Sequence, residues 1–424
     1  MNQDKYNKIV EKAKYCLHCK NKPCSRACPL SNNIPEFIEK LKNENIEEAY
    51  KVLSETTIFE PICGRICPHE SQCEGSCIRG IKGNSVSIGE LESFVGDYIL
   101  ENNVGVAPLG DHLIKTNAIN INKKIAIIGS GPAGLSASYL LSNNGYKVDI
   151  FEKHSKLGGL LRYGIPEFRL DKKLLDDWLE KFILNDNIKI HTNKELGNDF
   201  SIEDLKSKYD YIILAFGANI SNKMNIPGEE KEFVYGGNEL LEYKKMPEFA
   251  GKNVVINGGG NVAIDSAREI KRRGATKVTI VYRRSEVEMP ASKKEVNTAL
   301  NDGIEFLFQT NILQILDGKI ECIKTELIQK EGESRKVPVN IADSEFSLSV
   351  DYVVKAIGAH PNNEVIDSLG LKTNKWGYLE IDENYKTSDN KIYAVGDLAG
   401  TKQTVAWAAR SGFECAKQII NDAR

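Results

Sequence analysis

Two stretches of this sequence repeat one pattern: a short apolar strand, a glycine-rich turn, the start of a helix and a second strand. In the first stretch these parts are Ile125–Ile128, Gly129–Gly134, Leu135–Ser142 and Val148–Phe151, and in the second they are Asn253–Ile256, Gly258–Ala263, Ile264–Lys271 and Val278–Tyr282. A glycine turn of this kind lets a pyrophosphate approach the backbone at the positive N-terminus of the helix. The repeat therefore predicts an α/β chain with two Rossmann-like dinucleotide-binding domains in tandem.

The first turn is followed by an acidic residue at a position that favours a dinucleotide. The candidate binding residues of the turn are Gly129, Gly131, Pro132, Ala133 and Gly134. Glu152 ends the next strand, 23 residues after Gly129, where a carboxylate can accept hydrogen bonds from ribose hydroxyls. A glycine motif alone could be a bare turn. Strand, glycines, helix, strand and acid together favour a binding site.

The segment 392–397 near the C-terminus indicates which dinucleotide the first domain binds. A strand that ends in Gly396 and Asp397 can place a carboxylate on the ribityl chain of a flavin. We expect the next helix to begin at about Thr404 and Val405 and to direct its N-terminus at the flavin edge that becomes anionic on reduction. A Gly-Asp pair alone is usually a simple turn. After the first motif, it favours FAD over a second nicotinamide.

The second turn is followed by arginines instead of an acid. Its candidate binding residues are Gly258, Gly260, Asn261, Val262 and Ala263. Arg283 and Arg284 stand after the next strand, where an NAD site would carry a carboxylate. A guanidinium pairs well with a dianionic phosphate, so the pattern favours the 2′-phosphate of NADPH. The alternative is a solvated basic strand end.

No catalytic side chain is predicted, because hydride transfer between nicotinamide and flavin needs no general acid or base. The six histidines show no triad or metal spacing. A flavoprotein disulfide reductase would need a close cysteine pair beside the flavin. No Cys-x2-Cys or Cys-x4-Cys occurs after residue 112, which argues against that class.

Eight of the ten cysteines lie between Cys16 and Cys77. Their spacing is Cys16-x2-Cys19-x4-Cys24-x3-Cys28-Pro29 and Cys63-x3-Cys67-Pro68-x4-Cys73-x3-Cys77. Thiolates in Cys-x3-Cys-Pro runs are typical iron–sulfur ligands, and zinc is the serious alternative. One-electron carriers have an evident use in an FAD and NADPH enzyme, so clusters are favoured. Cys322 and Cys415 stand alone and are expected to be buried apolar residues.

Composition narrows the class further. The net charge of −3 gives no reason to expect nucleic acid or a membrane as partner. The first fifteen residues carry too many charges for a secretory signal, and no stretch reaches the ~18 apolar residues of a membrane helix. The expected location is the cytoplasm.

These motifs, in this order, resemble those of the small subunit of bacterial glutamate synthase. They also resemble the N-terminal half of dihydropyrimidine dehydrogenase and the large subunit of NADH-dependent ferredoxin:NADP oxidoreductase. The resemblance covers nearly the whole chain. Its most specific stretches are CGRICPHESQCEGSC (63–77), SIGELE (87–92), GGLLRYGIPEFRL (158–170), YRRSEVEMPA (282–291) and AVGDLAG (394–400).

The resemblance implies site residues that the spacing does not show. One [4Fe–4S] cluster would be held by Cys16, Cys19, Cys24 and Cys77, and the other by Cys28, Cys67, Cys73 and Glu92. Glu92 without the resemblance would be a carboxylate on a helix surface, and Cys63 would be a spare thiol. Gly158, Gly159 and Arg162 match flavin-contacting positions of the family. Asn261 matches a position near the nucleotide, and Arg283 and Arg284 match its 2′-phosphate binders.

The resemblance also implies the domain order. The expected domains are a helical [4Fe–4S] domain (1–112), a first part of the FAD domain (122–250), an inserted NADPH domain (251–353) and a second part of the FAD domain (354–424). Strand Tyr352–Ile357 would begin the return to the FAD domain, and Asn102–Asn122 would be a linker. The pattern alone also permits three domains in series.

The predicted function is electron transfer from NADPH through FAD and two [4Fe–4S] clusters to a partner subunit or a ferredoxin-like protein, as in the glutamate synthase small-subunit type. No glutaminase domain or FMN barrel is recognisable in the sequence, so another protein would use the electrons. One alternative is the NADPH-side subunit of a ferredoxin-linked transhydrogenase. Another is a zinc-bearing redox-sensing or docking module, and a third is a monomeric diaphorase.

Overall fold

The computed structural model describes residues 3–102, 104–105, 123–242, 246–330, 332–333, 335–400 and 402–422. The predicted linker Asn102–Asn122 lies almost wholly outside the described residues. The chain forms two compact units. Unit 1 contains residues 1–162, 167–217 and 363–424, and unit 2 contains residues 163–166 and 218–362. Among the described helices, none is both long and apolar enough to cross a membrane.

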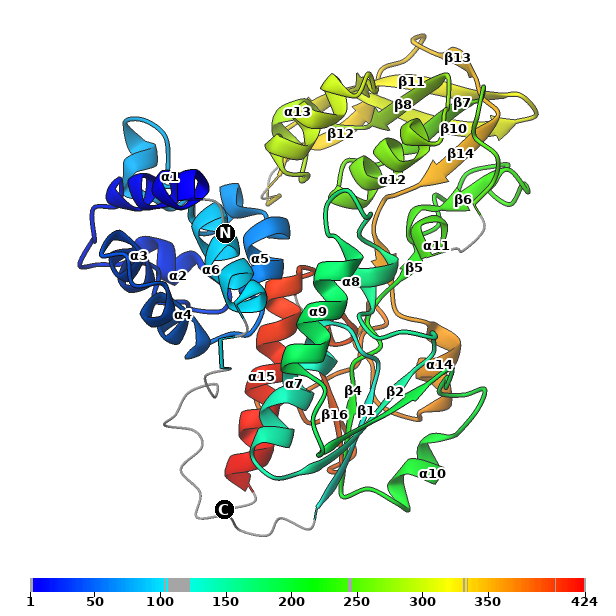
Figure 1. The fold of residues 1–424 in the computed structure, drawn as a ribbon. Coiled ribbons are helices and arrows are strands. Elements are labelled where there is room, and N and C mark those ends of the chain that lie inside the picture. Colours follow the sequence, from blue (N-terminus) through cyan, green and yellow to red (C-terminus); the bar gives the residue numbers. More distant parts are fainter. Residues whose placement is uncertain are drawn as a thin grey trace. The chain divides into compact units, whose positions relative to one another are not determined.

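The first part of unit 1 is helical, as predicted (Figure 1). Its helices are α1 (Gln3–Lys14), α2 (Pro23–Ala27), α3 (Ile34–Lys42), α4 (Ile46–Ser54), α5 (Glu60–Ile66) and α6 (Ile88–Glu101), with short 3₁₀ turns η1 (His69–Ser71) and η2 (Ile78–Ile81). Helices α3 and α4 cover the helix-forming stretches 34–41 and 46–53 of the sequence. Besides its cysteines, this part has an apolar core. Fully buried apolar side chains come from most of these helices: Phe37, Leu41, Leu53, Ile62, Leu91 and Val95.

Helices α5 and α6 pack backbone to backbone. A Cβ added at Gly64 would lie 2.4 Å from the amide nitrogen of Ser93, and one at Gly96 would lie 2.5 Å from the nitrogen of Pro61. These glycines permit an approach that larger residues would prevent. The close approach holds Cys63 of α5 near Glu92 of α6.

The helical part is joined to the first sheet region of unit 1 by specific contacts. Trp178 of α9 (Lys172–Phe182) is fully buried and donates its indole N–H to the carbonyl oxygen of Ile58 at 2.6 Å. Its ring lies 4.8 Å from that of Phe59. Arg410 of α15 (Val405–Asp422) donates to the carbonyl oxygen of Pro29 at 2.8 Å. Pro29 directly follows Cys28, so α15 touches the cysteine region.

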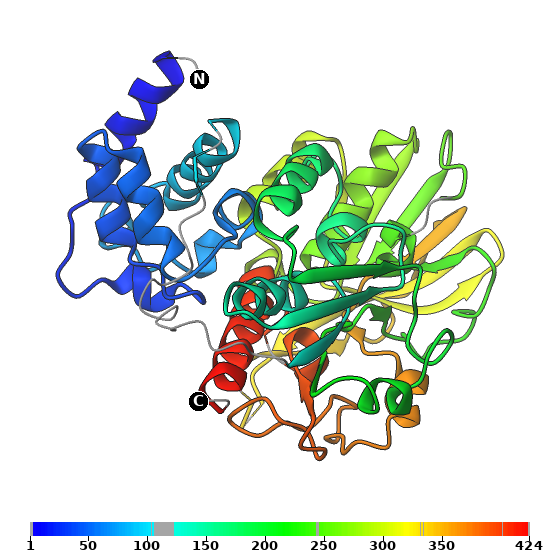
Figure 2. The same ribbon diagram turned by 60° about the horizontal axis from the view of Figure 1, so that its bottom comes forward.

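The first sheet is parallel and has the order β16-β4-β1-β2-β3. Its strands are β1 (Lys124–Ile128), β2 (Lys147–Glu152), β3 (Ile188–Thr192), β4 (Tyr211–Leu214) and β16 (Ile392–Ala394), and its helices are α7 (Pro132–Asn143), α8 (Leu160–Tyr163), α9, α10 (Ile202–Lys206), α14 (Asn363–Ser368) and α15. Strand β16 joins from almost 180 residues further along the chain, beside β4. Both views show the red helix α15 beside α7 (Figures 1 and 2).

Unit 2 contains a second parallel sheet with the order β6-β14-β7-β8-β9. Its strands are β6 (Val234–Gly236), β7 (Asn253–Asn257), β8 (Lys277–Tyr282), β9 (Glu305–Phe308) and β14 (Tyr352–Lys355). Its helices are α11 (Gly237–Glu242), α12 (Asn261–Arg272) and α13 (Lys293–Asn301), with the 3₁₀ turn η3 (Glu286–Glu288). A smaller antiparallel sheet follows, made of β10 (Thr310–Leu316), β11 (Lys319–Ile328), β12 (Val337–Asn340) and β13 (Phe346–Ser349).

The predicted strand–turn–helix–strand repeats are confirmed, but the predicted domain boundaries need correction. Strand β14 pairs with β7 and β6 in the second sheet, so the strand predicted at Tyr352–Ile357 does not return to the first domain. Strand β6 also belongs to this sheet, so the second domain begins before residue 251. The observed insertion spans residues 218–362. Sheet membership depends on long-range pairing, which local patterns do not specify.

The two chain crossings pair with each other at the base of the insertion. Residues 215–217 and 356–358, expected to be crossover strands, are irregular. The pairing strands come just after them, as β5 (Ile220–Ser221) and β15 (Ala359–His360), which are antiparallel. The insertion thus leaves and re-enters the first domain through a two-stranded link.

Candidate cofactor sites

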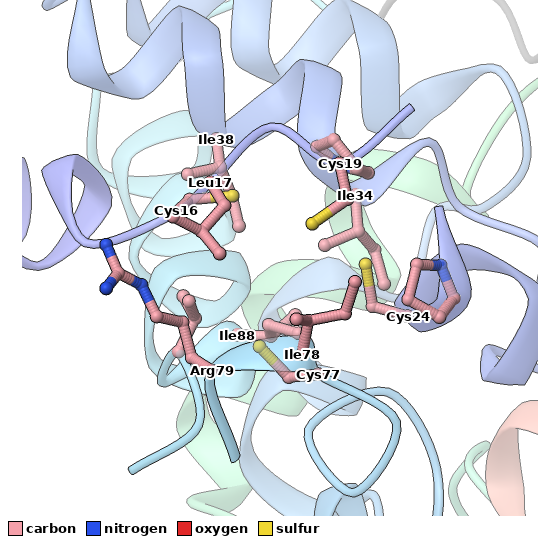
Figure 3. A pocket seen from close by; sticks show the side chains of 13 residues that line it. Cys16, Leu17, Cys19, Cys24, Ile34, Ile38, Cys77, Ile78, Arg79 and Ile88 are labelled. Atoms are coloured by element: carbon pink, nitrogen blue, oxygen red, sulfur yellow. The ribbon is translucent and has the colours of Figure 1, made fainter. Parts of the chain in front are cut away.

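Four of the predicted cluster ligands line one hollow in the helical domain (Figure 3). Cys16 follows α1, Cys19 lies in the next loop, Cys24 lies in α2 and Cys77 precedes η2. The space between the atoms that line it, including open solvent at its mouth, is about 350 Å³. Figure 3 shows the four sulfur atoms turned toward a shared interior. The remaining wall is mostly apolar and includes Ile34, Ile38, Val86 and Ile88.

The thiols of this first cysteine set influence one another. Burial raises the pKa of Cys24 to about 11, and the nearby Cys16 and Cys77 add to the rise. Burial also raises the pKa of Cys16, with Cys19 and Cys77 adding to it. Cationic metal centres favour thiolates, so ligation would release these protons. The set of four thiols and the apolar wall around them fit a four-iron cluster.

The other predicted ligands, Cys28, Cys67, Cys73 and Glu92, form a second group. Burial raises the pKa of Cys28 to about 12, and the charges of Glu92 and Cys67 contribute. Burial is also the main cause that raises the pKa of Cys73, and the charges of Glu92, Cys28 and Cys67 add to the rise. Cys63 lies in this group too, hydrogen-bonded to Cys67. Three thiols and a carboxylate thus lie close enough to interact electrostatically.

Glu92 is 6% exposed, so its interpretation as a helix-surface carboxylate is wrong. Burial raises its pKa to about 8. Asn32 donates to its Oε1 at 3.2 Å, and Thr56 donates to the side-chain oxygen of Asn32 at 2.7 Å. These two hydrogen bonds hold the carboxyl group of Glu92 in place among the thiols. Neither Asn32 nor Thr56 was predicted, because neither carries a motif.

Glu60 is a second buried carboxyl group near this cysteine set that the sequence did not reveal. It is fully buried at the start of α5, and neither carboxylate oxygen has a hydrogen-bond partner in the described part of the chain. Burial raises its pKa well above the usual value, and Glu92 adds to the rise. The buried site therefore disfavours the charged form of Glu60. Across the described residues, no three His, Cys, Asp or Glu side chains are arranged to hold a single metal ion.

The first glycine turn has the backbone geometry of a phosphate cradle. Gly129 has φ +101°, and a Cβ at Gly134 would lie 2.1 Å from the carbonyl oxygen of Gly129. Gly131 caps α7, and a Cβ there would meet nothing within 4 Å. The space beside Gly131 at the helix N-terminus is therefore open to an anionic group.

Glu152 lies at the end of β2, as predicted, and is 4% exposed. Its Oε2 accepts from the amide of Ser130 at 3.1 Å, and its Oε1 accepts from the amide of His154 at 2.9 Å. The hydroxyl of Ser130 also donates to Oε2. Oε1 is therefore the oxygen that keeps a further lone pair for a ribose hydroxyl. Strand order brings the acid beside the turn because β1 and β2 are neighbours.

The segment 158–162 contacts the first turn. The amide of Gly158 donates to the carbonyl oxygen of Ser130 at 3.1 Å. A Cβ at Gly159 would lie 2.7 Å from the Cα of Gly131. Arg162 is held by an ion pair with Asp176 and by the carbonyl oxygen of Leu157. The two glycines thus lie at the predicted flavin side, and Arg162 is oriented by protein groups.

Asp397 is half-buried and lies shortly after β16, in the 3₁₀ turn η4 (Gly396–Ala399), with its Oδ1 out of reach of solvent. Within the described residues its Oδ1 has no hydrogen-bond partner, and burial raises its pKa to about 7. An orphaned buried carboxylate oxygen is what a ribityl hydroxyl could satisfy. Helix α15 begins at Val405, directly after Thr404, as predicted. A Cβ at Gly412 of α15 would lie 1.9 Å from the carbonyl oxygen of Ala133 on α7, so α15 and α7 are in direct contact.

The second glycine turn is built in the same way in unit 2. Gly258 has φ +151°, and a Cβ at Gly260, which caps α12, would meet nothing within 4 Å. Asn261 begins α12, and its Oδ1 accepts from the amide of Ser292 at 3.2 Å. Val262 is half-buried and Ala263 is fully buried in the domain core. The open side of Gly260 offers the same space as that of Gly131.

The two predicted phosphate-binding arginines follow β8 and differ in their contacts. Arg283 is exposed, and its guanidinium has no ion-pair or hydrogen-bond partner in the described regions. Arg284 is half-buried and donates to the carbonyl oxygen of Lys336 at 3.3 Å. Arg335 and Lys336, which sequence reasoning missed, add positive charge beside them, since Arg335 donates to the carbonyl oxygen of Glu288 in the same loop. Their proximity results from the β11–β12 hairpin.

Both lone cysteines are fully buried, as predicted: Cys322 lies in β11 and Cys415 in α15. The fold and these sites define a class of protein, a reductase built from two dinucleotide-binding domains with an added cysteine-rich helical domain. Residues 123–412 match the family described as pyridine nucleotide-disulphide oxidoreductase. Residues 2–104 match the family described as dihydropyrimidine dehydrogenase domain II, 4Fe-4S cluster.

Individual relatives agree with these matches. The chain is 32% identical to the glutamate synthase [NADPH] small chain of Azospirillum brasilense, over 96% of this chain and 88% of the relative. It is 35% identical to the Escherichia coli protein AegA, over 96% of this chain but only 65% of AegA. The chain therefore belongs to the pyridine nucleotide-disulphide oxidoreductase family and, within it, to the group of the glutamate synthase small chains.

A solved structure supports the fold. Mycobacterium tuberculosis FprA in complex with NADPH aligns with a TM-score of 0.62 at 19% identity, over 71% of this chain and 84% of FprA. At that identity the likeness shows the shared arrangement of two dinucleotide-binding domains. The fold class predicted from the glycine turns is confirmed.

Proposed function

We propose that this chain takes a hydride from NADPH onto FAD and passes single electrons through two [4Fe–4S] clusters to a partner protein. The observation that carries the proposal is the combination, in one chain, of two glycine turns with open helix N-termini and two groups of buried or half-buried thiols. Membership of the glutamate synthase small-chain group and the 4Fe-4S family match support it.

The protein's residues bind and orient the cofactors. Bound FAD converts a two-electron hydride donor into one-electron steps, and bound clusters carry the single electrons. Gly131 and Gly260 would receive the two pyrophosphates, and Arg283 and Arg284 the 2′-phosphate. Glu152 and Asp397 would accept from sugar and ribityl hydroxyls. No side chain has to move a proton, which agrees with the absence of a predicted acid or base.

The contacts within unit 1 support an order for the two proposed clusters. Arg410 of α15 donates to Pro29, next to Cys28 of the second group, so this group borders the proposed flavin half. The first group lies at a hollow lined by Leu17, which is 50% exposed. Electrons would pass from the flavin to the second group, then to the first, and leave there.

The proposed partner is a separate subunit or a ferredoxin-like carrier. The name of the Azospirillum relative, a small chain, favours a subunit. The transhydrogenase alternative keeps the same cofactors and differs in whether reduced ferredoxin can drive the reduction of NADP. Anaerobic NADP reduction with reduced ferredoxin separates the two.

The proposed function is tested by the cofactor content of protein purified without oxygen. We expect one FAD, acid-labile sulfide and about eight irons per chain, the number for two four-iron clusters. NADPH should bleach the flavin at much lower concentration than NADH. Zinc in place of iron, or a flavin that neither nucleotide bleaches, would contradict the proposal and favour a docking or sensing protein.

A pair of glycine variants tests the first cradle. Gly131→Ala should leave the free energy of unfolding within about 0.5 kcal/mol, because φ is −73° and the added methyl group meets nothing. It should nevertheless weaken FAD binding by about tenfold or more, since the methyl group occupies the phosphate space. Gly134→Ala should instead destabilise the chain by about 3 kcal/mol, because its Cβ meets the Gly129 carbonyl oxygen. Urea unfolding of FAD-free protein measures the free energy of unfolding, and titration with FAD measures the affinity for FAD. Equal effects of the two variants on stability would contradict the cradle.

A pH dependence tests the environment of Asp397. Its folded pKa of about 7 lies above its ordinary value of 3.8, so its contribution to stability is present below the unfolded pKa and is lost as pH rises toward 7. In FAD-free protein, Asp397→Asn should reduce the fall in unfolding free energy between pH 5 and pH 8 by about 2–3 kcal/mol. The exposed Asp367→Asn is the control. An unchanged pH dependence in Asp397→Asn would show that this carboxyl group is not buried as described.

A further inference from the structure

The outer edge of the first cysteine hollow carries exposed apolar side chains. Tyr15, Leu17 and Ile81 are 39%, 50% and 77% exposed. Leu17 and Arg79 line the hollow together with Cys16 and Cys77 (Figure 3). Large apolar side chains gathered at one place on a surface mark sites of protein contact more often than chance exposure does.

These apolar residues are held together as one face. The guanidinium carbon of Arg79 lies 4.2 Å from the centre of the Tyr15 ring, and its Nε donates to the carbonyl oxygen of Tyr15 at 2.9 Å. A Cβ at Gly83 would lie 3.7 Å from the Tyr15 hydroxyl, so the loop after η2 packs on the same ring. We call this surface the exit face and define it by six residues: Tyr15, Leu17, Lys20, Arg79, Ile81 and Lys82.

The exit face carries positive charge that no carboxylate of the described residues pairs with. Lys20, Arg79 and Lys82 form no ion pair with a carboxylate among the described residues. The carboxylate whose charge reaches Cys16 is that of Glu39, and it is already engaged in an ion pair with Lys42 at 3.1 Å. The free charge beside the hollow is thus cationic, and a partner with carboxylates would complement it.

We propose that the exit face docks an acidic one-electron carrier protein and delivers electrons to it from the first cysteine group. An apolar centre with a charged rim is the usual anatomy of a specific interface, and the cationic rim would steer an acidic partner to the cluster edge. The proposal rests on the proposed function and specifies its partner. For each NADPH oxidised, two oxidised carriers take one electron each, and NADP⁺ and one proton are released.

The test is a binding measurement on the cofactor-loaded chain, with an acidic [4Fe–4S] ferredoxin as probe and a basic cytochrome c as its counterpart. Calorimetric titration at low salt should show that Lys20→Glu/Lys82→Glu weakens ferredoxin binding by about tenfold, because both charges of the rim are reversed. The difference should shrink as ionic strength rises. Ile81→Ser, which keeps every charge, should also weaken binding. Lys208→Glu, an exposed lysine after α10, is the matched control and should bind as the wild type does.

Two other readouts separate this proposal from the proposed function. Iron content and flavin bleaching by NADPH in the wild-type chain test the proposed function without the partner. If the wild-type chain contains no iron or its flavin is not bleached, both the proposed function and the docking proposal are contradicted. With these intact, equal ferredoxin affinity in the wild type and in both exit-face variants would overturn the docking proposal. So would tighter binding of cytochrome c than of ferredoxin by the wild-type chain. If the double variant loses iron, the ferredoxin affinity of Ile81→Ser still tests the docking proposal.

Discussion

Cys24→Ala is expected to remove about four of about eight irons per chain while FAD stays bound. Cys24 is 8% exposed and lines the hollow with Cys16, Cys19 and Cys77, so its loss leaves three thiolates for a four-iron cluster. Flavin bleaching by NADPH should continue, because the glycine turns lie in other parts of the fold. Electron delivery to a protein acceptor should fall to background. Iron analysis and a carrier-reduction assay on the same sample measure both effects.

Cys63→Ala is the matched control for this prediction. Cys63 is buried in the same domain and hydrogen-bonded to Cys67, but it belongs to neither proposed ligand set. Its removal should leave the iron content unchanged. Full iron in Cys24→Ala, or equal iron loss in both variants, would contradict the proposed ligand assignment.

Arg283→Ala/Arg284→Ala is expected to lower kcat/KM for NADPH by about 10- to 100-fold, the loss of charge-assisted hydrogen bonds worth about 1.5–3 kcal/mol. Arg283 is exposed after β8, and in the described residues its guanidinium is unpaired, so it is available to a 2′-phosphate. NADH lacks that phosphate, and its kcat/KM should change little. Steady-state rates with each nucleotide, with ferricyanide as the electron acceptor, give the ratio of kcat/KM for NADPH to kcat/KM for NADH.

The control for the arginine prediction is Arg273→Ala. Arg273 lies just past α12 in the same domain and pairs with Glu269, so its removal takes away one positive charge elsewhere. It should leave the preference for NADPH intact. An unchanged NADPH-to-NADH ratio in the double variant would show that Arg335 and Lys336, or other groups, recognise the phosphate instead.

Local features of the fold were predictable from the sequence because local geometry produces them. The turns at Gly129 and Gly258 need positive φ, and Gly134 must let α7 approach the turn, so glycine spacing indicates them directly. Helices α3 and α4 follow from apolar periodicity. The acid at Glu152 and the arginines after β8 follow from the position of strand ends.

Features that depend on distant residues were not predictable in this way. The membership of β14 in the second sheet is decided by pairing with β7, about a hundred residues earlier. The burial of Glu92 results from the close packing of α5 on α6 through Gly64 and Gly96. Glu60 has the composition of an ordinary first-turn acid, and only the fold places it beside Glu92. The resemblance, not the residue pattern, pointed to Glu92.

The most direct test of the central claim follows the electrons in time. Cofactor-loaded protein is mixed with NADPH without oxygen, and flavin absorbance is recorded beside paramagnetic resonance of samples frozen at successive times. The account predicts flavin bleaching first, then the signal of a reduced [4Fe–4S] cluster, with an altered cluster signal in Cys24→Ala. Flavin reduction with no cluster signal at any time, in protein that contains its iron, would contradict the path from NADPH through FAD to the clusters.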